Sequence, residues 1–408
     1  MHNVPFISDE QRVLYHSDLA TVQKAFARGE PLPSFEVAGP RERLFFDPAR
    51  VKAGLVTCGG LCPGLNDVIR AIVLSLQYHY GVQTIYGFRY GYAGLVEESG
   101  WEPVRLNAET VDHIEDLGGT ILGSSRGPQD VGRMVDTLER LGLQMLFVIG
   151  GDGTLKGGRD MADEIERRGL KIAVVGVPKT IDNDIDCIQM SFGFRTAVSE
   201  AGKAVAAAHI EAKGAPNGVG LVKLMGRQSG FIAAHAALAG SQVNFCLVPE
   251  SPFSLEAFLD ALRARLERRH HAVVVVAEGA GQDLMQATLG RDASGNVKLG
   301  DIGVFLRDEI RAHFRALGTP VALKYMDPSY LIRSVPANAF DSAFCLLLGH
   351  NAVHAAMSGR TNVVVGFWLN EFTHVPIPMA TARRKQIDLN SRLWSSVLAS
   401  TGQPREMR

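Results

Sequence analysis

Short apolar runs recur along the chain, and many of them end abruptly in a loop rich in glycine or in acidic residues. Longer stretches with the amphipathic spacing of helices lie between these runs. Alternating strands and helices predict parallel β-sheets covered by helices, which is the α/β fold class. Because ligands bind at the carboxyl edge of such sheets, the loops that follow the apolar runs are the places where chemistry is expected.

The clearest case is the stretch 147–184, where two apolar runs flank one helical pattern. The first run, FVIG, continues into GDGT, and the second, AVVGVP, continues into KTIDND. Two strand exits joined by a helix are the pattern of a βαβ unit, so both loops should share one sheet edge. A glycine loop that can wrap phosphate would then face carboxylates that can hold a metal or accept a proton. This pairing predicts phosphoryl transfer.

In the motif GGDGT, the glycines let the backbone approach a polyphosphate without interference from a Cβ atom. Asp152 is the one anion of this loop. Because a carboxylate repels bound phosphates unless a cation lies between them, we expect Asp152 to bear on Mg²⁺. The alternative is that Asp152 caps the helix that starts near Thr154, a role that would not exclude the metal.

The motif PKTIDND carries two aspartates, Asp182 and Asp184, on either side of Asn183. In an extended segment both side chains would point to one side. A hydroxyl that attacks phosphorus must lose a proton, and an adjacent carboxylate can accept it. The second carboxylate can orient the site or the metal. The alternative is an acidic surface turn, although a buried-looking run leads straight into the motif.

Two further loops in the first half suit anions. In AGLVTCGGLCPGLNDVIR, a strand, a glycine turn and a helix start follow one another, and backbone N–H groups at such a helix start can hold an anion. In LGSSRGP, Ser124, Ser125 and Arg126 offer hydroxyls and a forked cation to a phosphate. The alternatives are a turn required only for tight packing and an arginine on a solvated loop.

The second half repeats the strand, loop and helix order, so a second α/β domain should start near 190–215. Arg227, at the strand exit in KLMGRQSG, can fork onto a sugar phosphate. Two later strands end in acids, Glu250 and Glu278, and a glutamate at that place can bind sugar hydroxyls.

The segment KYMDPSYLIR is a late basic and aromatic loop with Lys324, Tyr330 and Arg333. These side chains could grip a second anionic end of a ligand. They could equally form a solvated face.

Charge and composition narrow the possible partners. Lys plus Arg (42) nearly balances Asp plus Glu (43), which argues against a nucleic-acid or membrane-surface partner. No apolar run approaches a membrane span, and the start MHNVPFISDEQR lacks a signal pattern. Five cysteines, mostly in apolar or glycine-rich runs, favour reduced thiols in a cytoplasmic protein. Cys58 and Cys62 have no second Cys/His pair nearby, so we expect no zinc site there.

Taken in order, these motifs resemble the phosphofructokinase family over about residues 50–365. They are GGLCPGLN, LGSSRG, GGDGT, PKTIDND, GFRTA, KLMGRQSG, PE, AEGAGQ and KYMDPSYLIR. The likeness is to the ATP-using plant and protist type rather than to the short bacterial enzyme. It implies two doubly wound, Rossmann-like α/β domains, with the active site in the cleft between them.

On a chain of 408 residues, two domains are also what length alone favours. We expect an N-terminal extension at 1–50 on the surface or at a subunit contact. A nucleotide-binding domain at 51–190, to which later segments return, and a fructose 6-phosphate domain at 191–365 should follow. A strand and helix segment at 366–408 would close the chain.

The resemblance also implies roles for individual residues. Asp182 would be the general base, and Asp152 would bear on Mg²⁺. The nucleotide would be lined by Gly60, Arg126, Gly127, Gly151, Asp152, Gly153 and Thr154. The sugar phosphate would be bound by Thr180, Asp182, Asp184, Met225, Gly226, Arg227, Glu278, Tyr330 and Arg333.

Donor choice depends on two positions that point in opposite directions. In pyrophosphate-using members an aspartate commonly replaces the glycine at Gly153, where it crowds the α-phosphate of a nucleotide. Lys179, in contrast, resembles the lysine of pyrophosphate enzymes. We favour ATP, because an absent side chain permits a bulky donor, whereas a flexible lysine can move aside or bind a phosphate of either donor.

The function expected from the sequence is an ATP-dependent 6-phosphofructokinase of glycolysis, with Mg²⁺, that phosphorylates the 1-hydroxyl of fructose 6-phosphate. The alternatives are a pyrophosphate-dependent enzyme and a catalytically silent subunit that binds sugar phosphate or nucleotide. A lipid or NAD kinase would share only GGDGT. A homodimer or homotetramer is expected. The strand NGVGLVKLMGR lacks the early arginine that short bacterial enzymes share between subunits, so such an arginine must come from elsewhere.

Overall fold

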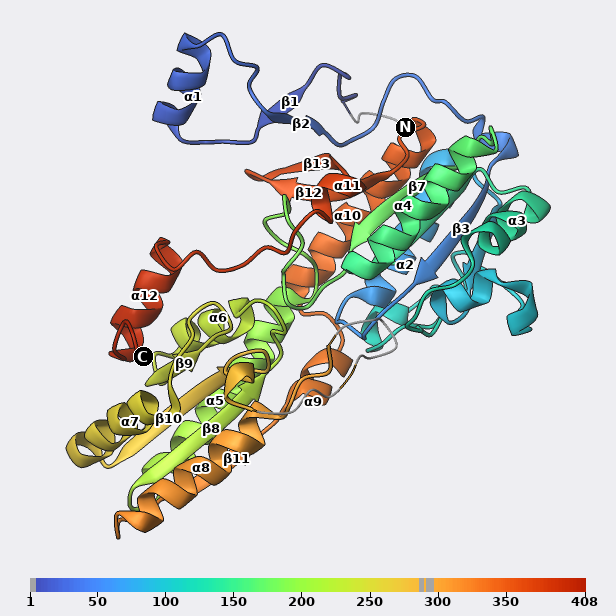
Figure 1. The fold of residues 1–408 in the computed structure, drawn as a ribbon. Coiled ribbons are helices and arrows are strands. Elements are labelled where there is room, and N and C mark those ends of the chain that lie inside the picture. Colours follow the sequence, from blue (N-terminus) through green and yellow to red (C-terminus); the bar gives the residue numbers. More distant parts are fainter. Residues whose placement is uncertain (1–4, 286–289, 291–296) are drawn as a thin grey trace. The chain divides into compact units, whose positions relative to one another are not determined.

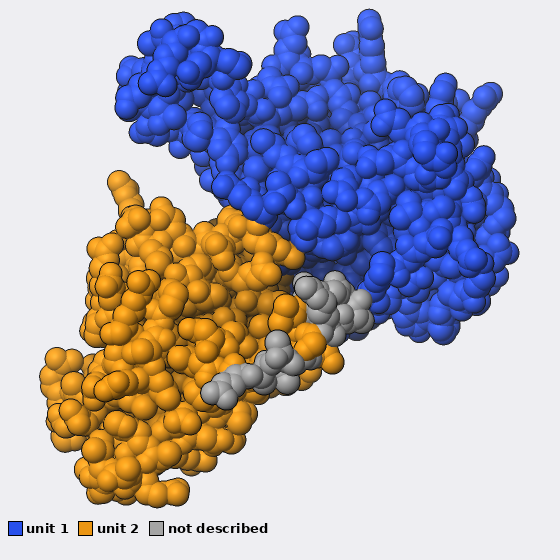
Figure 2. Space-filling view, viewed as in Figure 1, with its two compact units in different colours: residues 1–180, 185–193, 335–383 blue, residues 181–184, 194–334, 384–408 orange. Residues whose placement is uncertain are grey.

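The computed structural model describes residues 5–285, 290 and 297–408 (Figure 1). The chain divides into two compact units, which Figure 2 colours separately. Unit 1 comprises Met1–Thr180, Ile185–Gly193 and Val335–Arg383, and unit 2 comprises Ile181–Asp184, Phe194–Ser334 and Arg384–Arg408. The short stretch Ile181–Asp184 thus belongs to a different unit from the residues on either side of it.

Unit 1 is built around a nine-stranded sheet with the order β1-β2-β13-β12-β7-β6-β3-β4-β5. The strands from β12 to β4 run parallel, whereas the outer strands join in antiparallel pairs. In that order the strands are Arg12–Leu14, Ser34–Val37, Glu371–Pro376, Val363–Trp368, Ala173–Pro178, Met145–Gly150, Lys52–Thr57, Thr84–Phe88 and Val104–Arg105. The two apolar runs of the sequence, β6 and β7, lie side by side and are buried along their whole length, as expected for central parallel strands.

Helices cover this sheet. Met134 of α3 and Met161 of α4 share one core cluster with Leu146 and Val148 of β6. Helix α10 packs against α2 and also against β7. The helices of unit 1 are α1 (Leu19–Ala27), α2 (Leu65–Leu74), α3 (Val131–Leu141), α4 (Asp152–Arg167), α10 (Ala339–Met357) and α11 (Ile377–Ala380), with a π-turn at Ser75–His79 and short 3₁₀ turns at Pro48–Arg50, Gly91–Leu95, Glu97–Ser99 and Ile114–Asp116.

Unit 2 has a four-stranded parallel sheet with the order β11-β8-β10-β9. The strands are β8 (Gly218–Leu224), β9 (Phe245–Leu247), β10 (His271–Ala277) and β11 (Ala322–Met326). The helices are α5 (Phe194–Lys213), α6 (Phe231–Gly240), α7 (Leu255–Arg269), α8 (Ile302–Ala316), α9 (Ser329–Ser334) and α12 (Arg392–Thr401), with a 3₁₀ turn at Gln282–Leu284.

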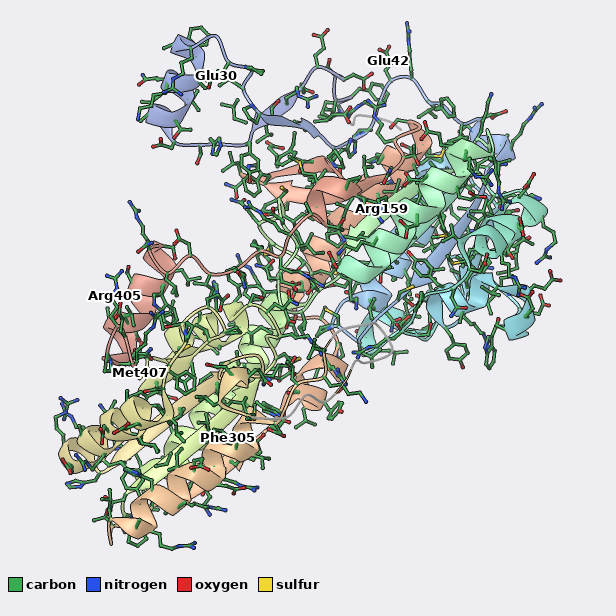
Figure 3. The ribbon with its side chains drawn as sticks, in the orientation of Figure 1. Glu30, Glu42, Arg159, Phe305, Arg405 and Met407 are labelled. Carbon is green, nitrogen blue, oxygen red and sulfur yellow. The ribbon has the colours of Figure 1, made fainter. Side chains whose placement is uncertain are left out.

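The side chains of β10 show that helices cover both faces of this sheet. Val273 and Val275 belong to a core cluster shared with α5, α6 and α12. Val274 and Val276 belong to a second cluster shared with α7 and α8. Alternate residues of a strand point to opposite faces, so unit 2 is a doubly wound α/β unit. Phe305 of α8 and Met407, both labelled in Figure 3, belong to or pack against the second cluster.

Three segments differ from the expected division of the chain. Part of the N-terminal extension enters the unit 1 sheet, because β2 pairs with β13, while α1 buries no residue. Residues 335–365, expected in the second domain, cluster with unit 1, because α10 packs on α2 and β12 pairs with β7. The expected closing segment 366–408 is divided, because residues up to 383 cluster with unit 1 and residues 384–408 cluster with unit 2.

Among the described residues, none of the helices could span a lipid bilayer. All five cysteines are buried. Burial raises the pKa of the Cys58 thiol to about 12, so this thiol is neutral at physiological pH and packs as an apolar group.

Candidate active site

The GGDGT loop of unit 1 leads from β6 directly into α4. Gly151 is the N-cap residue, and Asp152 is the first residue of the helix. The sequence interpretation in which Asp152 caps a helix starting near Thr154 is therefore wrong: the helix starts two residues earlier, and its cap has no side-chain hydrogen bond. A carboxylate in the first turn is favoured by the helix dipole. Lys156 Nζ lies 3.0 Å from Asp152 Oδ2, one turn further along the same helix.

The glycines of this loop have different surroundings. A Cβ atom added at Gly150 would lie 2.2 Å from the Thr154 hydroxyl, and one at Gly151 would lie 3.3 Å from the Lys179 carbonyl oxygen. A Cβ atom added at Gly153 would meet nothing within 4 Å. The first glycine is thus required by packing, whereas Gly153 borders open space beside the helix start.

Lys179 joins this loop to the glycine turn that follows β3. It is buried, its backbone N–H donates to the Gly150 carbonyl at 3.0 Å, and its Nζ donates to the Gly60 carbonyl at 2.6 Å. The strands β3, β6 and β7 are adjacent and parallel, so the loops after them share one edge of the sheet. Unit 1 therefore brings Gly60, Gly151 and Lys179 together at that edge.

The LGSSRG segment lies on the same glycine turn. Ser124 Oγ donates to the Gly59 carbonyl at 2.6 Å, and the Gly59 N–H donates to the Ser125 carbonyl at 3.0 Å. Ser125 Oγ donates to the Tyr90 carbonyl at 2.5 Å. The two hydroxyls, which the sequence interpretation offered to a phosphate, hold backbone in place here. Arg126 is exposed, and it is followed by Gly127, whose φ of +104° suits glycine.

The residues of this edge fit a magnesium ion carried by phosphates. Among the described residues, no three His, Cys, Asp or Glu side chains gather so that they could hold a metal ion by themselves. Mg²⁺ bound with a nucleotide does not need such a cluster, because one or two carboxylates and the phosphate oxygens suffice. Asp152, at a helix N-terminus beside open space, would supply one such carboxylate.

In unit 2, the acidic loop Ile181–Asp184 is a turn and not an extended segment. Asn183 has φ +56°, the left-handed conformation that asparagine tolerates. The expectation that both aspartates point to one side of an extended segment is therefore wrong. Asp184 is buried, and its Oδ2 lies 2.8 Å from Arg384 Nη1. Thr180, just before the loop, belongs to unit 1, where its carbonyl accepts from Ser191 Oγ at 2.6 Å.

Asp182 combines a buried carboxyl oxygen that has no partner among the described residues with a raised pKa. Its Oδ1 is buried and has no hydrogen-bond partner in the part of the chain that the structure describes. Burial, together with the negative charges of Asp184 and Glu278, raises the pKa of its carboxyl to about 8. The backbone N–H of Arg227 hydrogen-bonds to the carboxylate and opposes this shift. Such perturbation in a loop with free acceptor capacity is typical of catalytic carboxylates.

Strand pairing in unit 2 places the sugar phosphate candidates at one edge. Leu224 of β8 is in register with Ala277 of β10, so Met225 and Glu278 leave the sheet side by side. The Glu278 N–H donates to the Leu224 carbonyl at 2.9 Å. Burial raises the pKa of Glu278, and the positive charge of Arg227 opposes that shift. Gly226 has φ +131°, and a Cβ atom there would lie 2.6 Å from the Ser229 carbonyl oxygen.

The late aromatic and basic candidates divide into two places. Tyr330 and Arg333 lie in α9, which follows the carboxyl end of β11, and the Arg333 guanidinium lies over the Tyr330 ring at 4.5 Å. Tyr330 is 75% exposed, so its ring is accessible to a ligand. Lys324 lies within β11, and its Nζ is 4.0 Å from Oε2 of Glu211 in α5. The grouping of Lys324 with the other two residues in one loop is therefore wrong.

Glu250 has different partners from Glu278. Its carboxylate accepts the Gly230 N–H at 3.0 and 3.1 Å and the Ile387 N–H at 2.9 Å. It thus holds the start of α6 and a C-terminal segment, and both oxygens are in use. Sequence reasoning missed Arg384, which pairs with Asp184. The basic stretch ARRKQ carries no motif that could have identified it.

Comparisons with known proteins give a consistent result. The family described as Phosphofructokinase matches residues 52–356. An ATP-dependent 6-phosphofructokinase from Borreliella burgdorferi is 53% identical over 383 residues, which are 91% of this chain and 86% of that protein. An ATP-dependent 6-phosphofructokinase from Trypanosoma cruzi is 50% identical over 368 residues, covering 89% of this chain and 75% of that one.

A solved structure shows the same fold. It is the pyrophosphate-dependent phosphofructokinase from Marinobacter aquaeolei, with a TM-score of 0.71 and 19% identity, and the match covers 88% of this chain and 96% of that one. At this identity the likeness concerns the fold alone and carries no information on the donor. With the ordered motifs, the two α/β units and these relatives together, the chain belongs to the phosphofructokinase family.

Proposed function

We propose that this protein is an ATP-dependent 6-phosphofructokinase. It transfers the γ-phosphoryl group of Mg-ATP to the 1-hydroxyl of fructose 6-phosphate and yields fructose 1,6-bisphosphate and ADP. The observation that carries the proposal is the state of Asp182: a carboxyl with a buried oxygen and no partner for it, in the loop where a hydroxyl must be deprotonated. Relatives of about 50% identity that carry this enzyme name support the choice of reaction.

On the acceptor side, Asp182 accepts the proton of the attacking 1-hydroxyl as the new phosphorus–oxygen bond forms. Arg227, Arg333 and Tyr330 offer cations and a hydroxyl to the phosphate of the sugar. Glu278, which leaves the sheet beside Met225 and Gly226, accepts hydrogen bonds from sugar hydroxyls. Thr180 offers its hydroxyl on the unit 1 side of the acidic loop.

On the donor side, the backbone at Gly60, Gly151 and Gly127 approaches the phosphates closely, and Thr154 closes the first turn of α4. Arg126, which is exposed, adds a forked cation. Asp152 would hold Mg²⁺, which when bound offsets negative charge on the phosphates. Electrostatic stabilisation of this kind is the largest contribution in phosphoryl transfer.

A pyrophosphate-dependent reaction on the same acceptor is the second candidate, and Lys179 is the observation that favours it. Its ammonium group lies at the donor edge, 2.6 Å from the Gly60 carbonyl oxygen. There it could bind a terminal phosphate of either donor. Gly153 favours ATP, because the space beside it is open to a larger donor.

An assay of the two donors side by side tests the proposal. Purified protein is given fructose 6-phosphate and Mg²⁺ with either ATP or pyrophosphate, and fructose 1,6-bisphosphate is measured. Turnover with ATP at least 100 times that with pyrophosphate is expected. Turnover with pyrophosphate alone would overturn the donor choice. Binding of fructose 6-phosphate without product from either donor would instead identify a catalytically silent subunit.

Two expectations from the sequence belong with this proposal. Assembly into a homodimer or homotetramer and a cytoplasmic location both stay predictions. Sedimentation of the purified protein measures the first, and fractionation of the source cells measures the second.

A further inference from the structure

A short C-terminal segment of unit 2 contacts the backbone around Asp182 from several directions. We call residues 384–387 the strap. Arg384 Nη1 lies 2.8 Å from Asp184 Oδ2, and the Lys385 N–H donates to the Asp184 carbonyl at 2.9 Å. The strap thus holds both the side chain and the backbone of the residue that ends the acidic loop.

The same segment holds the loop after β8. Gln386 Nε2 donates to the Gln228 carbonyl at 3.0 Å. The Ile387 N–H donates to Glu250, whose carboxylate also accepts the Gly230 N–H. The residues on both sides of Ser229 are therefore held. Gln228 accepts a hydrogen bond from the strap directly, and Gly230 donates to the same Glu250 carboxylate as the strap residue Ile387.

These two loops meet at Asp182. The Arg227 N–H hydrogen-bonds to the Asp182 carboxylate, and the Ser229 hydroxyl lies 3.5 Å from the Asp182 carbonyl oxygen. The strap holds Asp184 in the acidic loop and Gln228 in the loop after β8. It therefore holds both loops that determine the orientation of Asp182.

The strap is itself anchored in the core. Ile387 is 5% exposed and Trp394 of α12 is 1% exposed, and both belong to the cluster that includes α5 and α6. Ser391 caps α12, accepting the Trp394 N–H at 3.3 Å. A segment fastened in this way can hold a loop in one position, which a free tail could not do.

We propose that Arg384 and Gln386 are positioning residues, which hold the loops on both sides of Asp182 in the arrangement that proton transfer from the acceptor requires. The proposal rests on the proposed function insofar as it concerns catalysis. The simpler view is that the pair of Arg384 and Asp184 only stabilises unit 2. Removal of one partner of a buried ion pair is destabilising, because it leaves the other charge without compensation. The two views differ in what they predict for kinetics.

Arg384→Met and Arg384→Lys test the proposal, with Arg383→Met as the matched control. Arg383 precedes Arg384 in the sequence and also pairs with an aspartate, since its Nε lies 2.6 Å from Asp186 Oδ2. Both residues of this second pair belong to unit 1. With Arg384→Met, kcat should fall about 10- to 100-fold, because small displacements of reacting groups have costs of this size. KM for ATP should change less than twofold, Arg384→Lys should recover part of kcat, and Arg383→Met should behave as wild type.

The pH profile shows whether Arg384 acts on the carboxyl of Asp182. The charge of Arg384 lowers the pKa of Asp182, whereas Asp184 raises it. Removing the arginine should therefore move the acid limb of kcat/KM for fructose 6-phosphate to higher pH, and an arginine without influence on this carboxyl would leave that limb in place. Normal kcat and an unmoved limb in folded Arg384→Met would overturn the proposal.

Hydrogen exchange gives a readout that does not depend on activity. Peptides that cover 181–184 and 226–230 should exchange faster in Arg384→Met and in the milder Gln386→Ala, with no change in Arg383→Met. Gln386→Ala keeps the ion pair, so it serves if Arg384→Met does not fold. Unchanged exchange in Gln386→Ala and Arg384→Met would overturn the strap's role. If the wild type transferred phosphoryl from neither donor, the proposed function would be overturned. The exchange experiment would still show whether the strap holds the two loops.

Discussion

The ammonium nitrogen of Lys179 lies 2.6 Å from the carbonyl oxygen of Gly60, although the two residues are far apart in the sequence. The contact joins the end of β7 to the turn after β3, across the strand β6 that lies between them. This hydrogen bond holds the side-chain nitrogen of Lys179 at the edge of the unit 1 sheet where the donor loops lie.

Lys179→Met should weaken binding of the phosphoryl donor. The methionine keeps much of the side-chain volume but removes the charge and leaves the Gly60 carbonyl without this donor. We expect KM for ATP to rise about tenfold, the equivalent of roughly 1.4 kcal/mol, with KM for fructose 6-phosphate nearly unchanged. Steady-state kinetics with each substrate varied in turn measure this. Equal increases for both substrates would show that the lysine does not act on the donor.

Gly153→Asp should change donor use without harming the fold. A Cβ atom at this position would meet nothing within 4 Å, so the side chain can be accommodated. A carboxylate beside the donor should repel the phosphates and lower kcat/KM for ATP by about 100-fold, a cost of roughly 2.7 kcal/mol. Gly150→Ala is the control for packing, because its Cβ atom would clash with Thr154 and should lower the melting temperature instead. ATP kinetics of wild-type quality in Gly153→Asp would remove this position from donor choice.

Asp182→Asn should abolish most turnover and yet stabilise the protein. General base catalysis contributes about 10²- to 10⁴-fold, so kcat should fall by that order. The pKa of this carboxyl is about 8 in the folded protein against 3.8 as the ordinary value, so between these pH values the folded state holds a proton that the unfolded chain has released. Stability from this group therefore decreases as pH rises through that window, and the neutral amide removes the effect.

We expect the free energy of unfolding of Asp182→Asn at pH 8 to exceed that of wild type by on the order of 1 to 2 kcal/mol, with a smaller difference at pH 5. Urea unfolding at the two pH values measures it. A variant that is less stable than wild type at pH 8 would contradict the assigned burial, and one with normal turnover would remove Asp182 as the base.

His354 should make the fold sensitive to acid. The residue is buried, and its Nδ1 is 2.7 Å from the Tyr80 hydroxyl. Burial and the neighbouring charges of His350 and His79 lower its pKa from 6.5 to about 3. Between these values the unfolded chain binds a proton that the folded protein does not, so stability is lost as pH falls below 6.5.

At pH 5 the loss from His354 amounts to about 2 kcal/mol relative to neutral pH. In His354→Gln, the drop in melting temperature between pH 7 and pH 5 should be clearly smaller than in wild type. His113, whose side chain is 79% exposed, supplies the control variant His113→Gln, which should keep the wild-type drop. An equal drop in all three proteins would assign the acid sensitivity to other groups.

The features that follow from strand ends could be predicted from the sequence. The runs that form β6 and β7 are apolar throughout, and a continuous apolar run of this length is typical of a strand at the centre of a parallel sheet. That placement alone brings GGDGT and Lys179 to one edge. The register of β8 with β10 likewise brings Met225 and Glu278 together.

Features that depend on tertiary partners could not be predicted. The left-handed conformation of Asn183 involves one residue only, so the pattern of apolar and polar positions contains no sign of it. The hydroxyls of Ser124 and Ser125 look available in the sequence, but backbone carbonyls distant in the chain accept from them. Arg384 lies 200 residues after its partner Asp184 and in no motif, so only the folded chain identifies it.

The division of the chain into interleaved segments has a consequence for how this enzyme can be taken apart. A gene fragment for 194–334 would encode the unit 2 sheet with most of its helices, but it would lack the Ile181–Asp184 loop, the strap and α12. Such a fragment would expose the apolar surface that Trp394 and Val397 cover and would lack Asp182. To produce unit 2 on its own, its three segments, Ile181–Asp184, Phe194–Ser334 and Arg384–Arg408, would have to be joined by new linkers.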